Sequence, residues 1–152
     1  VYVPSRAAGE DLIEKGITPS KICVVPVGVD TDLFHPSRRG TFFVDAYSMR
    51  PETMSIVYCG RVARDHNLHL LTEAFKELQA SGADASLVVI GDGPYRLEMQ
   101  EALRGLPATF ILNLDKQTLA HAFASADVFV SPAVNDLIGA RAFEAMASGL
   151  PA

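Results

Sequence analysis

The fold is decided by residues 55–94, which read SIVYCGRVARDHNLHLLTEAFKELQASGADASLVVIGDGP. The stretch contains two apolar runs, Ile56–Cys59 and Leu87–Ile90. Apolar residues recur at helical spacing between the runs, at Leu68, Leu71, Phe75 and Leu78. Near-continuous apolar strands separated by a helix are typical of a parallel sheet that is buried on both faces. The stretch therefore predicts a strand, a helix and a parallel strand.

The same alternation continues towards the end of the chain. The elements expected there are a helix opened by Pro94, a strand at Thr109–Leu112, a helix around Leu119 and Phe123 capped by Asp115, a strand at Asp127–Val130 and a helix from about Ala140 to Ser148. Together these segments predict an α/β fold, a Rossmann-like parallel sheet with helices on both faces.

A smaller unit precedes this pattern. We expect a strand at Tyr2–Pro4, a helix at Arg6–Lys15 ended by Gly16, and a strand at Ile22–Val27. A linker with Pro36, Gly40 and Pro51 follows, and its aromatic residues should pack on a domain surface: Phe34, Phe42, Phe43 and Tyr47. Both ends of the chain stop in mid-pattern, which predicts a fragment truncated at both ends.

Composition excludes several classes of function. The 152 residues are 49% hydrophobic and carry a net charge of −5 with a pI near 5.3, which argues against a nucleic-acid partner. No apolar run approaches the roughly 18 residues that span a bilayer, and the first residues do not resemble a signal peptide. Cys23 and Cys59 stand in apolar runs and are expected to be small core residues, so a reducing, cytoplasmic location is predicted.

Candidate functional residues lie in the turns that follow the strands, because ligands bind open parallel sheets at the carboxyl ends of their strands. Gly60 would let a backbone approach a ligand closely, and Arg61 offers a forked, charged donor suited to a diphosphate. His66 would lie at the start of the next helix. The alternative is that Arg61 pairs with an acidic neighbour and His66 is solvated.

A second group of candidates surrounds the start of the last helix. Gly139 precedes that helix, whose N-terminal N–H groups could bind an anion. Asp136 comes just before it, and Glu144 follows eight residues later among apolar and small residues. Burying a carboxylate there is costly without partners, and ligand hydroxyls are suitable ones. The alternative is a capping acid followed by an exposed glutamate.

Ordered motifs over nearly the whole chain resemble glycosyltransferase family 4, whose two-domain fold is called GT-B. The matching segments are Ser5-Arg-Ala, Val25-Pro-Val-Gly-Val-Asp-Thr-Asp-Leu-Phe-His-Pro, Tyr58-Cys-Gly-Arg-Val, Val89-Ile-Gly-Asp-Gly-Pro, Ala124-Ser-Ala-Asp-Val-Phe-Val-Ser-Pro and Asp136-Leu-Ile-Gly-Ala-Arg-Ala-Phe-Glu144. The last segment looks like the paired acidic motif of the family.

The resemblance implies a role for each matching residue. Arg61 would bind the donor diphosphate, Glu144 the ribose hydroxyls, and Asp136 would lie beside the transferred sugar. Backbone N–H groups near Ile138 and Gly139 would meet sugar or phosphate. The family retains anomeric configuration and uses neither a metal nor a cofactor, so none is expected here.

The resemblance also divides the chain. Residues 1–35 would end an N-terminal acceptor domain and its crossover, residues 36–54 would be a linker, and residues 55–152 would form an incomplete C-terminal domain that binds the nucleotide-sugar donor. The acceptor, whether a sugar, lipid or small molecule, is unspecified, and a peripheral membrane contact through the rest of the N-terminal domain is left open.

The sequence departs from the family pattern at several positions. His66 stands where the family usually has lysine, and Ile111-Leu112-Asn113 supplies no loop glycine. Ile138 replaces the usual aromatic residue, and Asp136 stands where glutamate is commoner. Donor handling could be altered by these changes.

The resulting hypothesis is a retaining glycosyltransferase that moves a hexose from a nucleoside diphosphate sugar to a hydroxyl acceptor. Its catalytic set would be Asp136, Glu144 and Arg61, with donor contacts also from Gly60, His66, Ile138 and Gly139. The alternative is a degenerate, non-catalytic paralogue that binds nucleotide sugars or a partner protein. A nicotinamide-binding domain is disfavoured, because no strand is followed by Gly-x-Gly-x-x-Gly.

Overall fold

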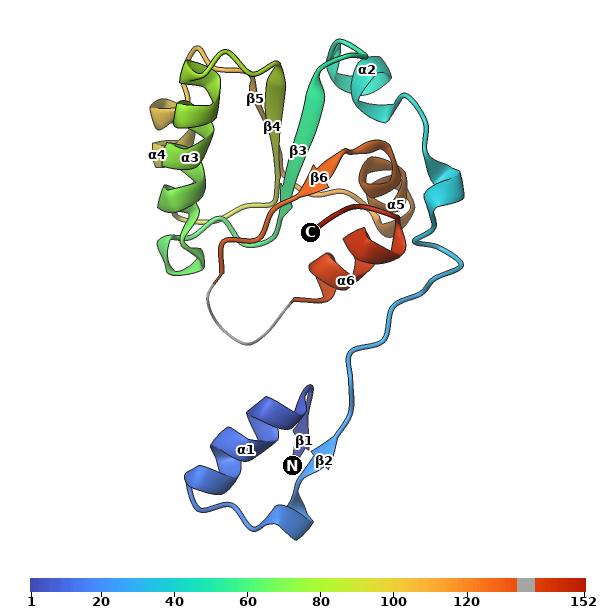
Figure 1. The fold of residues 1–152 in the computed structure, drawn as a ribbon, viewed down its shortest axis with the longest axis vertical. Coiled ribbons are helices and arrows are strands. Elements are labelled where there is room, and N and C mark those ends of the chain that lie inside the picture. The colour runs from blue at the N-terminus through green and yellow to red at the C-terminus, as the bar shows by residue number, and fades with distance from the viewer. Residues whose placement is uncertain (134–138) are drawn as a thin grey trace.

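The larger unit of the computed structural model, which describes residues 1–133 and 139–152, is built around a four-stranded sheet. Its strands are β3 (Met54–Cys59), β4 (Ala85–Ile90), β5 (Ala108–Ile111) and β6 (Val128–Phe129). They are ordered β5-β4-β3-β6, and every neighbouring pair is parallel (Figure 1). The carboxyl ends of all four strands therefore lie at the same edge of the sheet, where ligands bind open parallel sheets.

Helices cover both faces of this sheet (Figure 1). Helices α3 (Leu68–Ala80) and α4 (Arg96–Ala102) pack on one face, and α5 (Lys116–Ser125) and α6 (Ala140–Ala147) pack on the other. Strand β4 is buried along its whole length. Leu87 and Val89 belong to the core on the side of α3 and α4, and Val88 and Ile90 belong to the core on the side of α5 and α6. The period of two along a strand explains this division. The predicted two-sided Rossmann-like sheet is confirmed.

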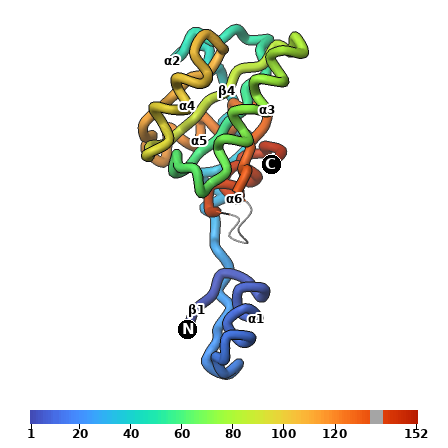
Figure 2. The backbone as a smooth tube through the Cα atoms, turned by 90° about the vertical axis from the view of Figure 1, so that its left-hand side faces the viewer, coloured from blue at the N-terminus to red at the C-terminus, as the bar shows by residue number. Residues whose placement is uncertain are grey.

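The smaller unit at the N-terminus pairs β1 (Tyr2–Val3) with β2 (Cys23–Val24) in parallel. Helix α1 (Arg6–Glu14) connects the two strands, and a short 3-10 turn, η1 (Pro19–Lys21), precedes β2. Ser5 caps α1 by accepting a hydrogen bond from the Ala8 N–H at 3.1 Å. The unit stands apart from the larger one and is joined to it by an extended segment (Figures 1 and 2).

The segment between the two sheets is more ordered than a linker of turns. It contains a 3-10 turn, η2 (Pro36–Arg38), and helix α2 (Phe42–Tyr47). Phe34 and Phe43 are buried in the core beside α5, and the Phe34 and Phe123 rings lie 6.2 Å apart. Phe42 and Tyr47 are partly buried against the same core, so the prediction that the aromatic residues of this segment pack on a domain surface is confirmed.

The cysteine expectation was wrong for Cys23 and right only in part for Cys59. Cys23 is exposed, because β2 is a two-residue strand with both side chains outside a core. Cys59 is half-buried, since it is the last residue of β3, where the sheet opens towards solvent.

The last residues of the chain contact the sheet. The N–H of Phe129 donates to the carbonyl of Pro151 at 2.8 Å, so the chain after α6 runs beside β6, at the edge of the sheet.

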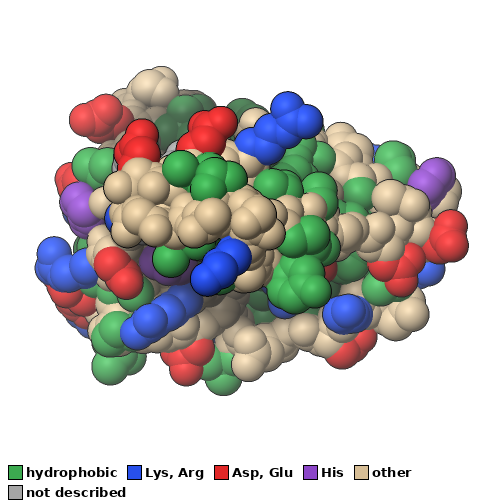
Figure 3. Space-filling model, turned by 90° about the horizontal axis from the view of Figure 1, so that it is seen from below, with side chains coloured by type: hydrophobic (Ala, Val, Ile, Leu, Met, Phe, Trp, Pro, Cys, Tyr) green, Lys and Arg blue, Asp and Glu red, His purple; other side chains and the backbone are tan. Residues whose placement is uncertain are grey.

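Acidic and basic side chains are interspersed on the face seen in Figure 3, with hydrophobic side chains between them. Within residues 1–133 and 139–152, no helix has the length and apolar content that a bilayer span requires.

Candidate functional site

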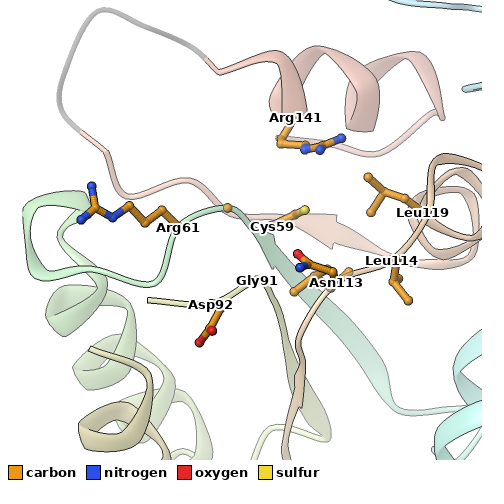
Figure 4. A pocket seen from close by; sticks show the side chains of 10 residues that line it. Cys59, Arg61, Gly91, Asp92, Asn113, Leu114, Leu119 and Arg141 are labelled. Atoms are coloured by element: carbon orange, nitrogen blue, oxygen red, sulfur yellow. The ribbon is translucent and has the colours of Figure 1, made fainter. Parts of the chain in front are cut away.

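A cavity of about 350 Å³ lies at the carboxyl edge of the sheet. The ends of β3 and β4, the turns after three strands, and two helices line it: Cys59 and Ile90 at the strand ends, Gly60 and Arg61 after β3, Gly91 and Asp92 after β4, Asn113 and Leu114 after β5, Leu119 on α5 and Arg141 on α6. Arg61 and Arg141 lie on opposite sides of the cavity, and the guanidinium of Arg61 points away from the other labelled side chains (Figure 4). The side chain of Arg61 extends away from Arg141, which lies on the Cys59 and Leu119 side.

Two glycines allow the turns after β3 and β4 to lie against each other. A Cβ atom on Gly91 would lie 1.9 Å from the Gly60 carbonyl oxygen, and one on Gly93 would lie 2.3 Å from the Val62 carbonyl oxygen. Their φ angles of +140° and +157° also disfavour other residues. Only glycine therefore fits at these positions, and the close packing of the two turns places Gly60 and Gly91 in the cavity lining.

A buried tyrosine supports the turn that carries Arg61. The Tyr58 hydroxyl donates to the Arg61 carbonyl oxygen at 2.8 Å and lies 3.2 Å from His66 Nδ1. Because a hydroxyl has one hydrogen and a carbonyl only accepts, His66 Nδ1 must donate to the tyrosine oxygen. Burial, with the charges of Cys59 and Asp65, raises the pKa of Tyr58 to about 12, so this donor stays protonated.

The start of α6 brings a cation and an anion together beside the cavity. Gly139 is the N-cap residue, with no side-chain cap among the described residues. Arg141 Nη1 donates to Glu144 Oε2 at 2.7 Å, and the Glu144 side chain is only 12% exposed. Burial raises the pKa of the Cys59 thiol to about 11, while Arg141 lowers it and Glu144 raises it, so both charges act on the end of β3.

The structure brings some of the predicted site residues together and separates others. Gly60 and Arg61 line the cavity, and Glu144 is linked to it through Arg141. His66 follows β3 in the 3-10 turn η3 (Arg64–His66), directed at Tyr58, and does not line the cavity. Asp136 and Ile138 lie outside the described residues.

Two residues of the site were missed by the sequence analysis. Arg141 was overlooked although a cation in the first turn of a helix opposes the helix dipole, which signals an anionic partner. Tyr58 was treated as part of an apolar strand, and no sequence signal places its hydroxyl under the Arg61 turn.

The described residues show no grouping of three or more His, Cys, Asp or Glu side chains that could hold a metal ion.

Comparisons with known proteins place these features in a family context. The model of the family described as "Glycosyl transferases group 1" matches residues 53–152. Sulfoquinovosyl transferase SQD2 of Arabidopsis thaliana is 35% identical over 98% of this chain and 29% of its own length. A GDP-mannose-dependent alpha-mannosyltransferase of Mycobacterium tuberculosis is 37% identical over 97% of this chain and 36% of its own. The chain thus spans about a third of the length of the relatives it matches.

Solved structures share the fold. Anabaena Alr3699/HepE in complex with UDP-glucose superposes with a TM-score of 0.82 at 18% identity, over 99% of this chain and 43% of that one. Sucrose-phosphate synthase from Thermosynechococcus elongatus superposes with a TM-score of 0.78 at 24% identity, over 99% of this chain and 39% of that one. The expected α/β fold of the GT-B type is confirmed.

Proposed function

Because this chain belongs to the glycosyl transferases of group 1, we propose that it forms most of the donor site of a longer, retaining glycosyltransferase. The enzyme would move a hexose from a nucleoside diphosphate sugar to a hydroxyl acceptor. The observation that carries the proposal is the 350 Å³ cavity at the carboxyl edge of the sheet, whose lining includes Gly60, Gly91 and Arg61. Residues 1–35 would end the acceptor domain, residues 36–54 would link the domains, and residues 55–152 would belong to the donor domain.

The chemistry requires stabilisation of a departing diphosphate while the sugar passes through a cationic state. Arg61 would pair with the diphosphate as a forked donor, and the N–H groups at the start of α6, from Gly139 onward, would meet its remaining oxygens. Glu144 would accept the ribose hydroxyls, and Asp136 and the backbone at Ile138 would lie near the sugar. No metal ion is needed for these contacts.

His66 would supply part of the positive field in place of the lysine that is usual in the family. Its Nδ1 hydrogen is already donated to Tyr58, so only Nε2 remains for the donor. A lysine side chain stays protonated well above neutral pH. His66→Lys should therefore strengthen diphosphate binding above neutral pH.

The nucleotide can be sought among three candidates. Relatives named for GDP-mannose and a neighbour solved with UDP-glucose make GDP and UDP the first probes, with ADP as the third. The test is calorimetric titration of the purified full-length protein with GDP, UDP and ADP, with and without EDTA.

We expect micromolar binding of one diphosphate that EDTA leaves unchanged. Arg61→Met should weaken binding of the nucleoside diphosphate by about tenfold or more, because a charge-assisted contact is lost. Binding of the matching nucleoside, which has no phosphate, should not change. Arg104→Met, which removes an exposed arginine that is not among the residues lining the cavity, serves as the control. Loss of binding in EDTA would contradict the metal-free site. Binding without sugar transfer to any acceptor in a panel would favour the non-catalytic alternative.

A further inference from the structure

Arg141 and Glu144 form an ion pair whose order along the helix is unusual in this molecule. Four ion pairs in the described residues join side chains three or four positions apart: Asp11–Lys15, Glu73–Lys76, Glu101–Arg104 and Arg141–Glu144. In the first three the acid precedes the base, which is the order that the helix dipole favours. In the fourth the base comes first, in the opening turn of α6. The helix dipole therefore favours this pair less than the other three.

The pair also differs in burial. The acids of the other three pairs are 56–66% exposed, whereas the Glu144 side chain is 12% exposed. A carboxylate that is withdrawn from water in this way must be compensated, and Arg141 provides the compensation through its 2.7 Å hydrogen bond. Arg141 itself is 44% exposed and lines the cavity. One oxygen of Glu144 is thus held by an arginine at the cavity wall.

We propose that Arg141 is a positioning residue that holds the Glu144 carboxylate ionised and oriented to accept ribose hydroxyls, and so makes the site select ribonucleotides over 2′-deoxyribonucleotides. The inference rests on the proposed function, because it takes the cavity to be a nucleotide site. Arg141 binds Oε2 of Glu144, which leaves Oε1 to accept a hydroxyl hydrogen. The guanidinium lies on the Cys59 and Leu119 side of the cavity, away from Arg61 (Figure 4). This placement separates Arg141 from the cation proposed for the diphosphate.

The test compares ribo- and deoxyribonucleotides on matched variants of the full-length protein. The probes are GDP, UDP, ADP and their 2′-deoxy counterparts, titrated by calorimetry against wild type, Arg141→Met, Arg141→Lys and Glu144→Gln. Arg141→Met should weaken the ribonucleotide that wild type binds by about tenfold, the scale of one hydrogen bond to a charged group. The affinity for the 2′-deoxy nucleotide should fall by about twofold or less, so the ratio of ribonucleotide to deoxyribonucleotide affinity decreases. Arg141→Lys should restore part of it, because an ammonium group can still donate to Glu144.

A double-mutant cycle separates positioning from direct contact. In the Glu144→Gln background, Arg141→Met should cost no further ribonucleotide affinity. Arg104→Met, which breaks the exposed Glu101 pair, should leave all affinities unchanged. A loss that is equal for ribo and deoxy forms, or that persists in the Glu144→Gln background, would overturn the inference and place Arg141 on the phosphate instead. Failure of wild type to bind any of the six probes would refute the proposed function, and the inference with it.

Discussion

Glu144 shows how a single side chain acquires a role from its surroundings. It stands on α6 between the buried residues Ala142 and Ala145, where most of its side-chain surface is shielded from solvent. Within residues 1–133 and 139–152, its carboxylate has one hydrogen-bond partner, Arg141. A polar group in such a place either has further partners in the working protein or destabilises it.

Replacing Glu144 by alanine should weaken binding of the donor nucleoside diphosphate by about 1–3 kcal/mol, because charge-assisted hydrogen bonds to the ribose are lost. Calorimetry on the full-length protein measures the change, with Glu101→Ala as an exposed control. Unchanged affinity in a correctly folded variant would leave Glu144 with a structural role only.

The two cysteines should react with alkylating reagents at very different rates. Burial raises the pKa of Cys59 to about 11, so at pH 8 about one thiol in a thousand is ionised. Cys23 is exposed and should be modified first. Peptide mass spectrometry after iodoacetamide treatment should show Cys59 labelling accelerate about tenfold per pH unit between about pH 8 and 10. The Cys23→Ser variant isolates the slow site, and equal labelling of both thiols at pH 8 would contradict the prediction.

At the scale of elements, Asp127 ties β6 to two other parts of the chain. Its carboxylate accepts from the Ser55 N–H at 2.9 Å and the Ser55 hydroxyl at 2.8 Å at the start of β3, and from Arg39 at 2.9 Å. Burial pushes the pKa of Asp127 up, but the hydrogen bonds from Ser55 and Arg39 outweigh it and leave the pKa below its usual value. The ionised carboxylate therefore stabilises the join between β3, β6 and the segment before α2.

Asp127→Ala should lower the free energy of unfolding by about 1–2 kcal/mol at pH 7, a value reduced because the side chain is 37% exposed. Because the folded-state pKa is depressed, this contribution is present above the unfolded value of about 3.9 and is lost as pH falls through the folded value. Urea unfolding at pH 7 and below pH 4 should show wild type and variant converging in acid. Glu77→Ala, at an exposed position on α3, is the control. A difference that persists in acid would assign the effect to packing.

At the scale of the whole molecule, the sheet needs both of its covering layers. One layer is α3 with α4, and the other combines α5 and α6 with residues from the segment that joins the two units. Phe34 belongs to that segment and is 2% exposed against α5. The joining segment is thus part of the core of the larger unit.

Phe34→Ala should reduce the stability of the unit that contains the sheet by about 3–5 kcal/mol, because it leaves a cavity the size of an aromatic ring. Denaturant unfolding of the full-length protein, followed by hydrogen exchange of β3 and β4 amides, measures this loss. Leu97→Ala, at a position 79% exposed, should change little. A similar result for both variants would show that the segment is not part of that core.

Local patterns were enough to predict the sheet and its helices. The apolar runs of β3 and β4, the helical spacing of α3 and the Asp115 cap of α5, which accepts from the Gln117 N–H at 2.9 Å, all depend on neighbours within a few residues. The position of Gly60 and Arg61 at the carboxyl end of β3 was predictable in the same way, and both line the cavity; that they bind a ligand stays a prediction. Such signals are carried by short stretches of chain.

Only the tertiary structure decided which side chains meet. The apolar run around Cys23 suggested a core that β2 lacks, and the turn-rich stretch 36–54 did not reveal α2. The hydroxyl of Tyr58 under the Arg61 turn and the guanidinium of Arg141 on the cavity wall follow from how β3 and α6 are packed. Sequence determines which local structures are stable, whereas burial and the partners of charged groups depend on contacts between residues far apart in the chain.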